Sequence, residues 1–266
     1  MRRIEESFRK KGHPRLVPFI MAGDPDAATT RDLLKLLDGE GVAAVEVGFP
    51  FSDPLADGPV IQEAASRALA QGMTLSRLWE TVSLARKQGV QTPLILFSYY
   101  NPLLSYGLRR LVADAKQAGF DGMIVPDLPI EESGILGTLC DEHDMALIPL
   151  VAPTSRQRIE KIASQARGLV YCVSSLGTTG KRDRFFPDIE GFLEAVRSYS
   201  PVPTVVGFGI SRSEQVRRFS RFADGVVVGS ALIERIASVS EQLRRAEVKQ
   251  DALEEIRRFV RKLKTE

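Results

Sequence analysis

The chain has 266 residues, of which 44% are hydrophobic and 26% are charged. This composition is ordinary for a globular protein and excludes a disordered or membrane-embedded chain. Because 36 basic residues face 34 acidic ones, the net charge is only +2, and we expect neither a nucleic-acid partner nor a membrane-surface partner.

The amino-terminal segment MRRIEESFRKKG is charged throughout and lacks the apolar stretch of a signal peptide. No later run approaches the roughly twenty apolar residues that span a bilayer. The two cysteines, Cys140 and Cys172, fall in an apparent helix and an apparent strand, without the spacing of a disulfide framework or a zinc site. The sequence therefore predicts a soluble, cytoplasmic protein with reduced core cysteines.

Short apolar runs alternate along the chain with longer stretches of helical periodicity, which is the pattern of βα units around a parallel sheet. Eight runs are predicted to be strands: Leu16–Ala22, Ala43–Val47, Pro93–Ser98, Gly122–Val125, Ala146–Val151, Leu169–Val173, Thr204–Gly207 and Gly225–Val228. Helices are predicted for Ala27–Asp38, Leu75–Lys87, Leu108–Ala118, Glu131–His143, Ser155–Ala166, Ile189–Ser198 and Ser213–Arg221. Three polar residues are expected to be helix N-caps, namely Asp24, Ser155 and Ser211.

Eight alternations favour a closed barrel over a doubly wound open sheet, although both share the local pattern. The longest irregular segments, Gly48–Gly58 and Ser174–Asp188, follow the second and sixth strands. This is the face where barrel enzymes keep their active sites. We therefore expect residues 1–266 to form one α/β domain, a (β/α)8 TIM barrel with an extra N-terminal helix (Arg3–Lys11) and an extra C-terminal helix (Asp251–Leu263).

Glu46 is the only residue in the eight strand windows that carries a formal charge. A carboxylate in a strand that is covered on both faces is costly to bury, so it should be paired, protonated or directed into a working cavity. One interpretation is a structural glutamate that pairs with an arginine on a neighbouring element. The other is a general acid or base whose pKa is raised by apolar surroundings.

The loop after this strand carries two more carboxylates, Asp53 and Asp57, between prolines that stiffen it. A carboxylate on the strand end and another on the loop could approach a substrate from two sides, as acid–base chemistry requires. Alternatively, the two aspartates only hydrogen-bond the backbone of the loop.

Glycines follow the seventh and eighth predicted strands, in Gly207–Ser211 and at Gly229–Ser230. Barrels commonly bind phosphate there, where backbone N–H groups and helix dipoles attract an anion, although a tight turn also needs glycine for conformational reasons. The segment Ser174–Arg184 could be a mobile lid over a substrate or an ordinary surface loop.

Missing residue types narrow the chemistry. No lysine falls in a strand window, so a Schiff-base aldolase is disfavoured. The only histidines are His13 and His143, too few for a zinc aldolase. Carbon–carbon cleavage would therefore depend on carboxylates, positioning and a substrate that accepts electrons.

Five segments resemble those of tryptophan synthase alpha subunits, in the same order and across essentially the whole chain. The longest is VEVGFPFSDPLADGPVIQ (Val45–Gln62), and the others are VPFIMAGDP (Val17–Pro25), YNPLLSYG (Tyr100–Gly107), DGMIVPDLPIEES (Asp121–Ser133) and GFGIS (Gly207–Ser211). The resemblance implies a retro-aldol cleavage of indole-3-glycerol phosphate in which the indole ring accepts the electrons.

By this resemblance, Glu46 protonates indole C3 and exchanges a proton with the glycerol hydroxyl, whereas Asp57 stabilises positive charge at the indole nitrogen. The same comparison assigns the substrate pocket to Phe19, Tyr99, Tyr171 and Phe208, and the phosphate site to Gly180, Gly209, Gly229 and Ser230. Thr179 corresponds to a lid residue that hydrogen-bonds Asp57. The lid departs from the usual Gly-Val-Thr-Gly, because Thr178 replaces the valine.

The resemblance also implies a partner, the tryptophan synthase beta subunit, in an alpha-beta-beta-alpha heterotetramer. No cofactor is expected in this chain, and pyridoxal phosphate is expected only in the beta partner. The implied contact surface comprises the loops Pro50–Asp57 and Leu103–Tyr106 together with the lid.

Two other functions stay open. A phosphate-binding barrel isomerase would share the glycines after strands seven and eight, but it would not need the loop SDPLADG. An allosteric subunit with decayed catalysis would still activate a beta partner, but the intact Glu46 and Asp57 speak against it.

Overall fold

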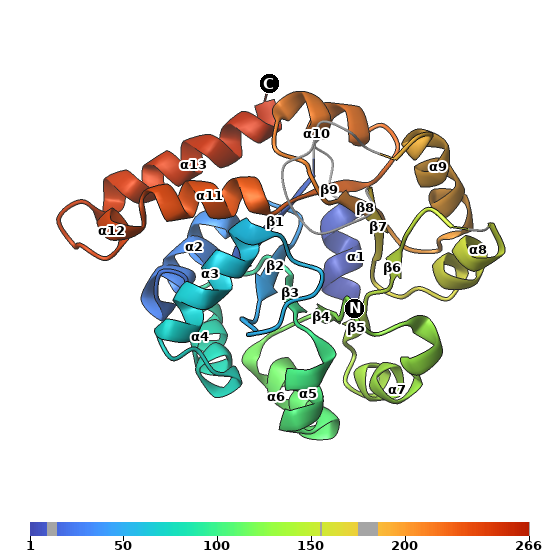
Figure 1. Ribbon diagram of the computed structural model, residues 1–266, viewed down its shortest axis with the longest axis horizontal. Helices are drawn as coiled ribbons and strands as arrows, with labels where there is room; N and C mark the ends of the chain where they lie inside the picture. Colours follow the sequence, from blue (N-terminus) through green and yellow to red (C-terminus); the bar gives the residue numbers. More distant parts are fainter. Residues whose placement is uncertain (10–14, 155, 175–185, 266) are drawn as a thin grey trace.

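The computed structural model describes residues 1–9, 15–154, 156–174 and 186–265. Its strands run parallel and form one sheet, with helices around the outside (Figure 1). The order in the sheet is β5-β4-β3-β2-β1-β9-β8-β7-β6. The strands are β1 (Leu16–Met21), β2 (Val45–Gly48), β3 (Leu94–Phe97), β4 (Gly122–Ile124), β5 (Ala146–Leu147), β6 (Leu150–Val151), β7 (Val170–Val173), β8 (Thr204–Gly207) and β9 (Gly225–Val228).

The two ends of this order, β5 and β6, are consecutive pieces of one extended segment. Between them the N–H of Ile148 donates to Met123 O on the β4 side at 2.9 Å, and Pro149 O accepts from the N–H of Tyr171 on the β7 side at 3.1 Å. The segment 146–151 therefore closes the sheet into a barrel, in which β5 and β6 together take the place of one of eight strands. This confirms the (β/α)8 barrel and excludes an open, doubly wound sheet.

The prediction of one unbroken strand over Ala146–Val151 is wrong, because the ladder changes sides at Ile148 and Pro149. Proline has no N–H to continue a ladder, which explains why the interruption falls there. The other seven strands agree with their predicted bounds to within two residues at each end.

All seven helices delimited from the sequence are present, with bounds within three residues of those predicted. They are α2 (Ala27–Gly39), α4 (Leu75–Lys87), α6 (Leu108–Ala118), α7 (Gly134–Glu142), α8 (Arg156–Ser164), α9 (Ile189–Tyr199) and α10 (Ser213–Phe219), with the extra terminal helices α1 (Arg2–Arg9) and α13 (Lys249–Thr265). Helices that were not delimited from the sequence are α3 (Pro59–Ala70), α5 (Tyr100–Tyr106), α11 (Ser230–Ser238) and α12 (Ser240–Leu243), besides the 3-10 turn η1 (Ile130–Glu132). Within the described residues, none of these helices has the length and apolar character to cross a membrane.

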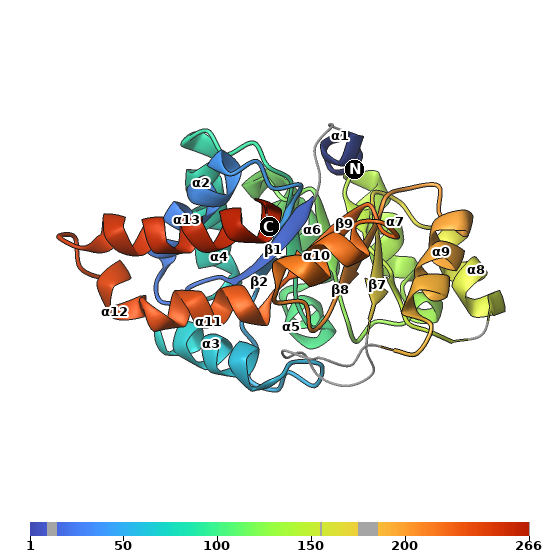
Figure 2. The ribbon, with the colours of Figure 1, turned by 90° about the horizontal axis from the view of Figure 1, so that it is seen from above.

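The two ends of the barrel are covered differently. Helix α1 lies across the amino-terminal end, where Ile4 and Phe8 are buried (Figure 2). The apolar side chains of α1 therefore belong to the core at the amino-terminal end. The opposite end carries α3 and α5, which follow the carboxyl ends of β2 and β3 (Figures 1 and 2).

Two of the three predicted N-caps are wrong. The cap of α2 is Asp26, whose Oδ1 accepts from the N–H of Thr29 at 2.6 Å, while Asp24 forms a bidentate ion pair with Arg67 of α3. The cap of α10 is Arg212 rather than Ser211. The third residue, Ser155, lies outside the described residues.

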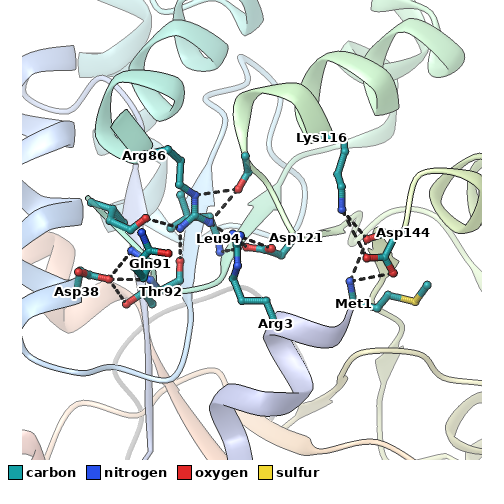
Figure 3. Close-up of polar contacts among 12 residues, drawn as sticks. Met1, Arg3, Asp38, Arg86, Gln91, Thr92, Leu94, Lys116, Asp121 and Asp144 are labelled. Atoms are coloured by element: carbon teal, nitrogen blue, oxygen red, sulfur yellow. Dashed lines mark hydrogen bonds and ion pairs between the residues drawn. The ribbon is translucent and has the colours of Figure 1, made fainter. Parts of the chain in front are cut away.

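A network of buried polar groups ties strands and helices together at the amino-terminal end of the barrel (Figure 3). Arg86 of α4 donates to the carbonyls of Val90, Thr92 and Gly119, and its Nη2 lies 2.9 Å from Asp121 Oδ2. Asp121 also accepts from the backbone N–H of Leu94 at 3.0 Å. Because donors and carboxylate satisfy one another, the network holds α4 against β3 and β4 and offsets part of the desolvation that lowers the pKa of Arg86.

We expect Asp121→Asn to lower the free energy of unfolding by about 3 kcal/mol, because it leaves the Arg86 guanidinium buried without its counter-charge. Urea titration measures this loss. The matched control is Asp144→Asn in the same region, where the side chain is 68% exposed and pairs with Met1 and Lys116. Its effect should stay within about 0.5 kcal/mol. Equal losses in the two variants would contradict this account of the network.

Candidate active site

Glu46 lies in the middle of β2, between Phe19 of β1 and Ile95 of β3 in the strand register. Its neighbours along the strand, Val45 and Val47, are fully buried, and its own side chain faces a cavity inside the barrel. The residue is 1% exposed, and its Oε1 has no hydrogen-bond partner within the described part of the chain. Burial raises the pKa of Glu46 from 4.5 to about 8.

These observations favour one of the two interpretations of Glu46. A structural glutamate would show a cation that offsets the cost of burial, but among the described residues burial alone accounts for the shifted pKa. A carboxyl group that is protonated at neutral pH and points into a cavity can donate a proton there.

Asp57 reaches the same cavity from the loop after β2. It is 6% exposed, and burial raises its pKa from 3.8 to about 6, against the opposing effect of a hydrogen bond with the Tyr99 side chain. The Tyr99 hydroxyl also accepts from the N–H of Ala56 at 3.0 Å, which fixes the loop beside α5. In contrast, Asp53 is exposed and accepts from the Ser52 hydroxyl at 2.5 Å, so only the second aspartate of the loop belongs to the site.

The cavity is lined mostly by apolar surface. Three of the four predicted pocket residues line it, namely Phe19, Tyr171 and Phe208. The rings of Tyr171 and Phe208 meet edge to face with their centroids 5.8 Å apart. Tyr99 does not line the cavity and acts instead on Asp57. A lining of aromatic rings and aliphatic side chains favours a flat aromatic ligand.

Sequence reasoning did not single out five further residues that line the cavity, Ile61, Phe97, Ile210, Val227 and Ala231. The sequence did contain a signal for Phe97. It is an aromatic residue at the carboxyl end of its strand, as Phe19 is near the end of β1, and this is the end of the barrel where a site was expected. Their rings also meet edge to face, 5.6 Å apart. Ile61 lies on α3, which the sequence analysis did not delimit although the helical spacing of its apolar residues was available.

The predicted phosphate residues Gly209, Gly229 and Ser230 line the same cavity. Gly229 directly precedes α11, so the first backbone N–H groups of this helix lie at the wall of the cavity. Gly209 has a φ of +84°, which the absence of a Cβ atom permits. The end of the cavity is therefore suited to an anion, which backbone N–H groups and the helix dipole would hold. The remaining predicted residues, Gly180 and lid residue Thr179, lie outside the described residues.

Comparison with known proteins agrees with this geometry. The family model of the tryptophan synthase alpha chain matches residues 6–265. The chain belongs to the tryptophan synthase alpha chain family. A family member from Shouchella clausii is 52% identical over 254 residues, which cover 96% of this chain and 94% of the relative. One from Halalkalibacterium halodurans is 48% identical and covers 99% of both chains.

Solved structures show the same likeness. A protein of Aquifex aeolicus VF5 superposes with a TM-score of 0.84 at 36% identity, over 98% of this chain and 97% of that chain. A chain from the tryptophan synthase a2b2 complex of Pyrococcus furiosus has a TM-score of 0.82 at 36% identity, over 94% and 97%. Because both the sequence and the fold match over nearly the full length, the chain shares the barrel fold of the family.

We expect the burial of Glu46 to appear in the pH dependence of stability. Because the pKa of Glu46 is higher in the folded protein, its contribution is fully present below about pH 4.5 and is lost as the pH rises to about 8. Glu46→Gln removes this loss. The variant should exceed the wild type in unfolding free energy by about 2 kcal/mol or more near pH 9, and by less near pH 5. Urea titrations across this range test it, and an advantage that does not change with pH would contradict it.

Proposed function

We propose that this chain cleaves indole-3-glycerol phosphate to indole and glyceraldehyde 3-phosphate, with Glu46 and Asp57 as the catalytic residues. The observation that carries the proposal is the buried carboxyl group of Glu46, whose Oε1 has no hydrogen-bond partner among the described residues, inside an aromatic cavity whose wall also has predicted phosphate-site glycines. Family membership favours this lyase reaction over a barrel isomerase, which would not need the loop SDPLADG.

The two carboxyl groups suit different roles because their pKa values differ. Glu46, with a pKa of about 8, is mainly protonated at neutral pH and can donate a proton to indole C3. Asp57, with a pKa of about 6, is mainly ionised and can accept the indole N–H, which becomes more acidic as the ring gains positive charge. Two carboxyl groups in one cavity thus supply an acid and an anion at the same pH.

The cleavage step then balances. Protonation at C3 makes the ring an electron acceptor, and ionised Glu46 takes the proton from the glycerol hydroxyl. The bond between C3 and the hydroxyl-bearing carbon breaks, its electron pair returns to the ring, and that carbon becomes the aldehyde of glyceraldehyde 3-phosphate. The backbone N–H groups at Gly209, Gly229 and Ser230, with Gly180, would hold the phosphate during this step. Thr179 would hydrogen-bond Asp57 when the lid closes.

The activity of Glu46→Gln tests the assignment of the acid. A carboxamide keeps the shape but cannot exchange the proton, so indole release should fall roughly 10²- to 10⁴-fold. Asp57→Asn should also lower the rate of indole release. Asp53→Asn, on the same loop but exposed, is the matched control and should stay within about twofold of the wild type. Equal indole release by Glu46→Gln and the wild type would refute the proposed role, and stimulation of a beta subunit by the inactive variant would show that the fold is intact.

The partner we propose is a tryptophan synthase beta subunit, in an alpha-beta-beta-alpha heterotetramer, and the Pyrococcus furiosus relative is named as part of a tryptophan synthase a2b2 complex. Three large apolar side chains that are more than half exposed lie on segments that follow the carboxyl ends of strands, Leu55 at 84% after β2, Leu104 at 54% after β3 and Ile135 at 70% after β4. Leu55 lies in the loop 50–57 and Leu104 in α5, and the stacking of Phe51 on Tyr99 holds these two segments together. Exposed apolar groups on neighbouring rigid elements are typical of a protein interface.

This surface lies beside the mouth of the cavity, because the same loop carries Asp57. A partner that binds there could receive indole and could sense whether Asp57 is engaged. We propose that pyridoxal phosphate belongs to the beta partner and that this chain works without a cofactor. We also propose that residues 1–266 form a single domain and that the protein is cytoplasmic.

Replacing both exposed leucines by aspartate (Leu55→Asp with Leu104→Asp) should weaken binding to a beta subunit by at least about 100-fold, because charges would be desolvated in an apolar contact. Isothermal titration calorimetry measures the affinity. Arg2→Asp on α1, at the opposite end of the barrel, also changes the charge but should leave the affinity within about twofold. Undiminished binding by the double variant would place the interface elsewhere.

A further inference from the structure

The turn after β8 contains a residue in an unusual backbone conformation. Phe208 has a φ of +75°, a region that residues with a side chain, and bulky ones above all, seldom occupy, and Gly209 follows with +84°. Strained residues of this kind persist only where the surrounding structure holds them, and they gather at functional sites. Something must therefore keep this turn in place.

The side chain that does so is Ser174, at the carboxyl end of the neighbouring strand β7. It is fully buried, and its backbone N–H donates to Gly207 O at 3.1 Å. Its hydroxyl donates to Gly207 O at 2.5 Å and to Phe208 O at 2.6 Å, so that one hydrogen is shared between two carbonyls. Both hydrogen-bond acceptors lie in the strained turn.

The positions of these two carbonyls are the basis of the inference. Gly207 O belongs to the peptide unit before Phe208, and Phe208 O belongs to the unit after it. The orientation of these two units is what φ and ψ of Phe208 describe, so a hydroxyl that binds both oxygens fixes both angles. In a trans peptide the C=O and the next N–H point in opposite directions. Holding Phe208 O toward Ser174 therefore turns the N–H of Gly209 away from Ser174.

We propose that Ser174 is a positioning residue that aims the Gly209 N–H at the phosphate of the substrate and holds the Phe208 ring against Tyr171. The inference rests on the proposed function, because it assumes that the wall of the cavity at Gly209 receives a phosphate. It adds a residue that touches no substrate atom and lies on a different strand from the group it orients. Phosphate affinity then depends on β7 as well as on the glycine turn itself.

Binding of two probes separates this role from a general loss of structure. Ser174→Ala removes the hydroxyl, and the dissociation constant for glycerol 3-phosphate should rise about 10-fold, the effect of one misdirected hydrogen bond to a charged group. The dissociation constant for indole, which has no phosphate, should change by less than about twofold. With the full substrate, KM should rise about 10-fold and kcat should stay within about threefold.

Thr81→Val is the matched control, because Thr81 is also buried and its hydroxyl also donates to a main-chain carbonyl, that of Arg77, at 2.6 Å. It should leave both dissociation constants unchanged. If Ser174→Ala does not fold, Ser174→Cys takes its place, because an S–H group is a weaker donor. The same two dissociation constants, for glycerol 3-phosphate and for indole, are then compared.

Unchanged affinity for glycerol 3-phosphate, or an equal weakening for glycerol 3-phosphate and indole, would overturn the role of Ser174. Failure of the proposed function looks different, because the wild-type chain would then bind glycerol 3-phosphate but release no indole from indole-3-glycerol phosphate. The two probe affinities need no turnover and report on Ser174 in either case.

Discussion

Closure of the sheet through residues 146–151 is the constraint on which the rest of the structure depends. This segment hydrogen-bonds β4 with its first half and β7 with its second, so no edge strand remains in the ring. Because all the strands are parallel, closure gathers their carboxyl ends at one rim. Phe19, Glu46, Tyr171 and Gly209 come from distant parts of the sequence and share one cavity for this reason.

The two ends of the barrel differ in whether a buried carboxyl group is paired with a cation. At the amino-terminal end, Asp121 and Arg86 satisfy each other and the nearby backbone, which stabilises the fold. At the carboxyl end, Glu46 is just as deeply buried, but its Oε1 finds no partner among the described residues. The barrel tolerates this cost because the rest of the core is large and apolar. A carboxyl group kept in the protonated form by burial is the useful result.

The backbone of the site is also held under strain, and the support comes from a neighbouring strand. The positive φ of Phe208 is maintained by the Ser174 hydroxyl, which lies 34 positions earlier in the chain. The Asp57 loop is likewise fixed from another element, through the Tyr99 hydroxyl. Side chains that meet the ligand are therefore placed by residues that do not, and the tertiary structure decides their geometry.

The sequence by itself determined the alternating βα architecture, because eight apolar runs with helical stretches between them bury their faces in a parallel sheet covered by helices, and it identified Glu46 as the one charge in the predicted strands, whereas the closure of the sheet was only favoured. It could also have revealed α3, since Pro59 stands at a first helical position and Ile61, Ala64, Ala65 and Ala68 repeat at helical spacing. Only the tertiary structure decided that Asp24 pairs with Arg67 rather than capping a helix, that Ala146–Val151 divides between two neighbours, and that Ser174 holds Phe208. Each of these depends on a partner far away in the chain, and local sequence preferences carry no information about such distant contacts.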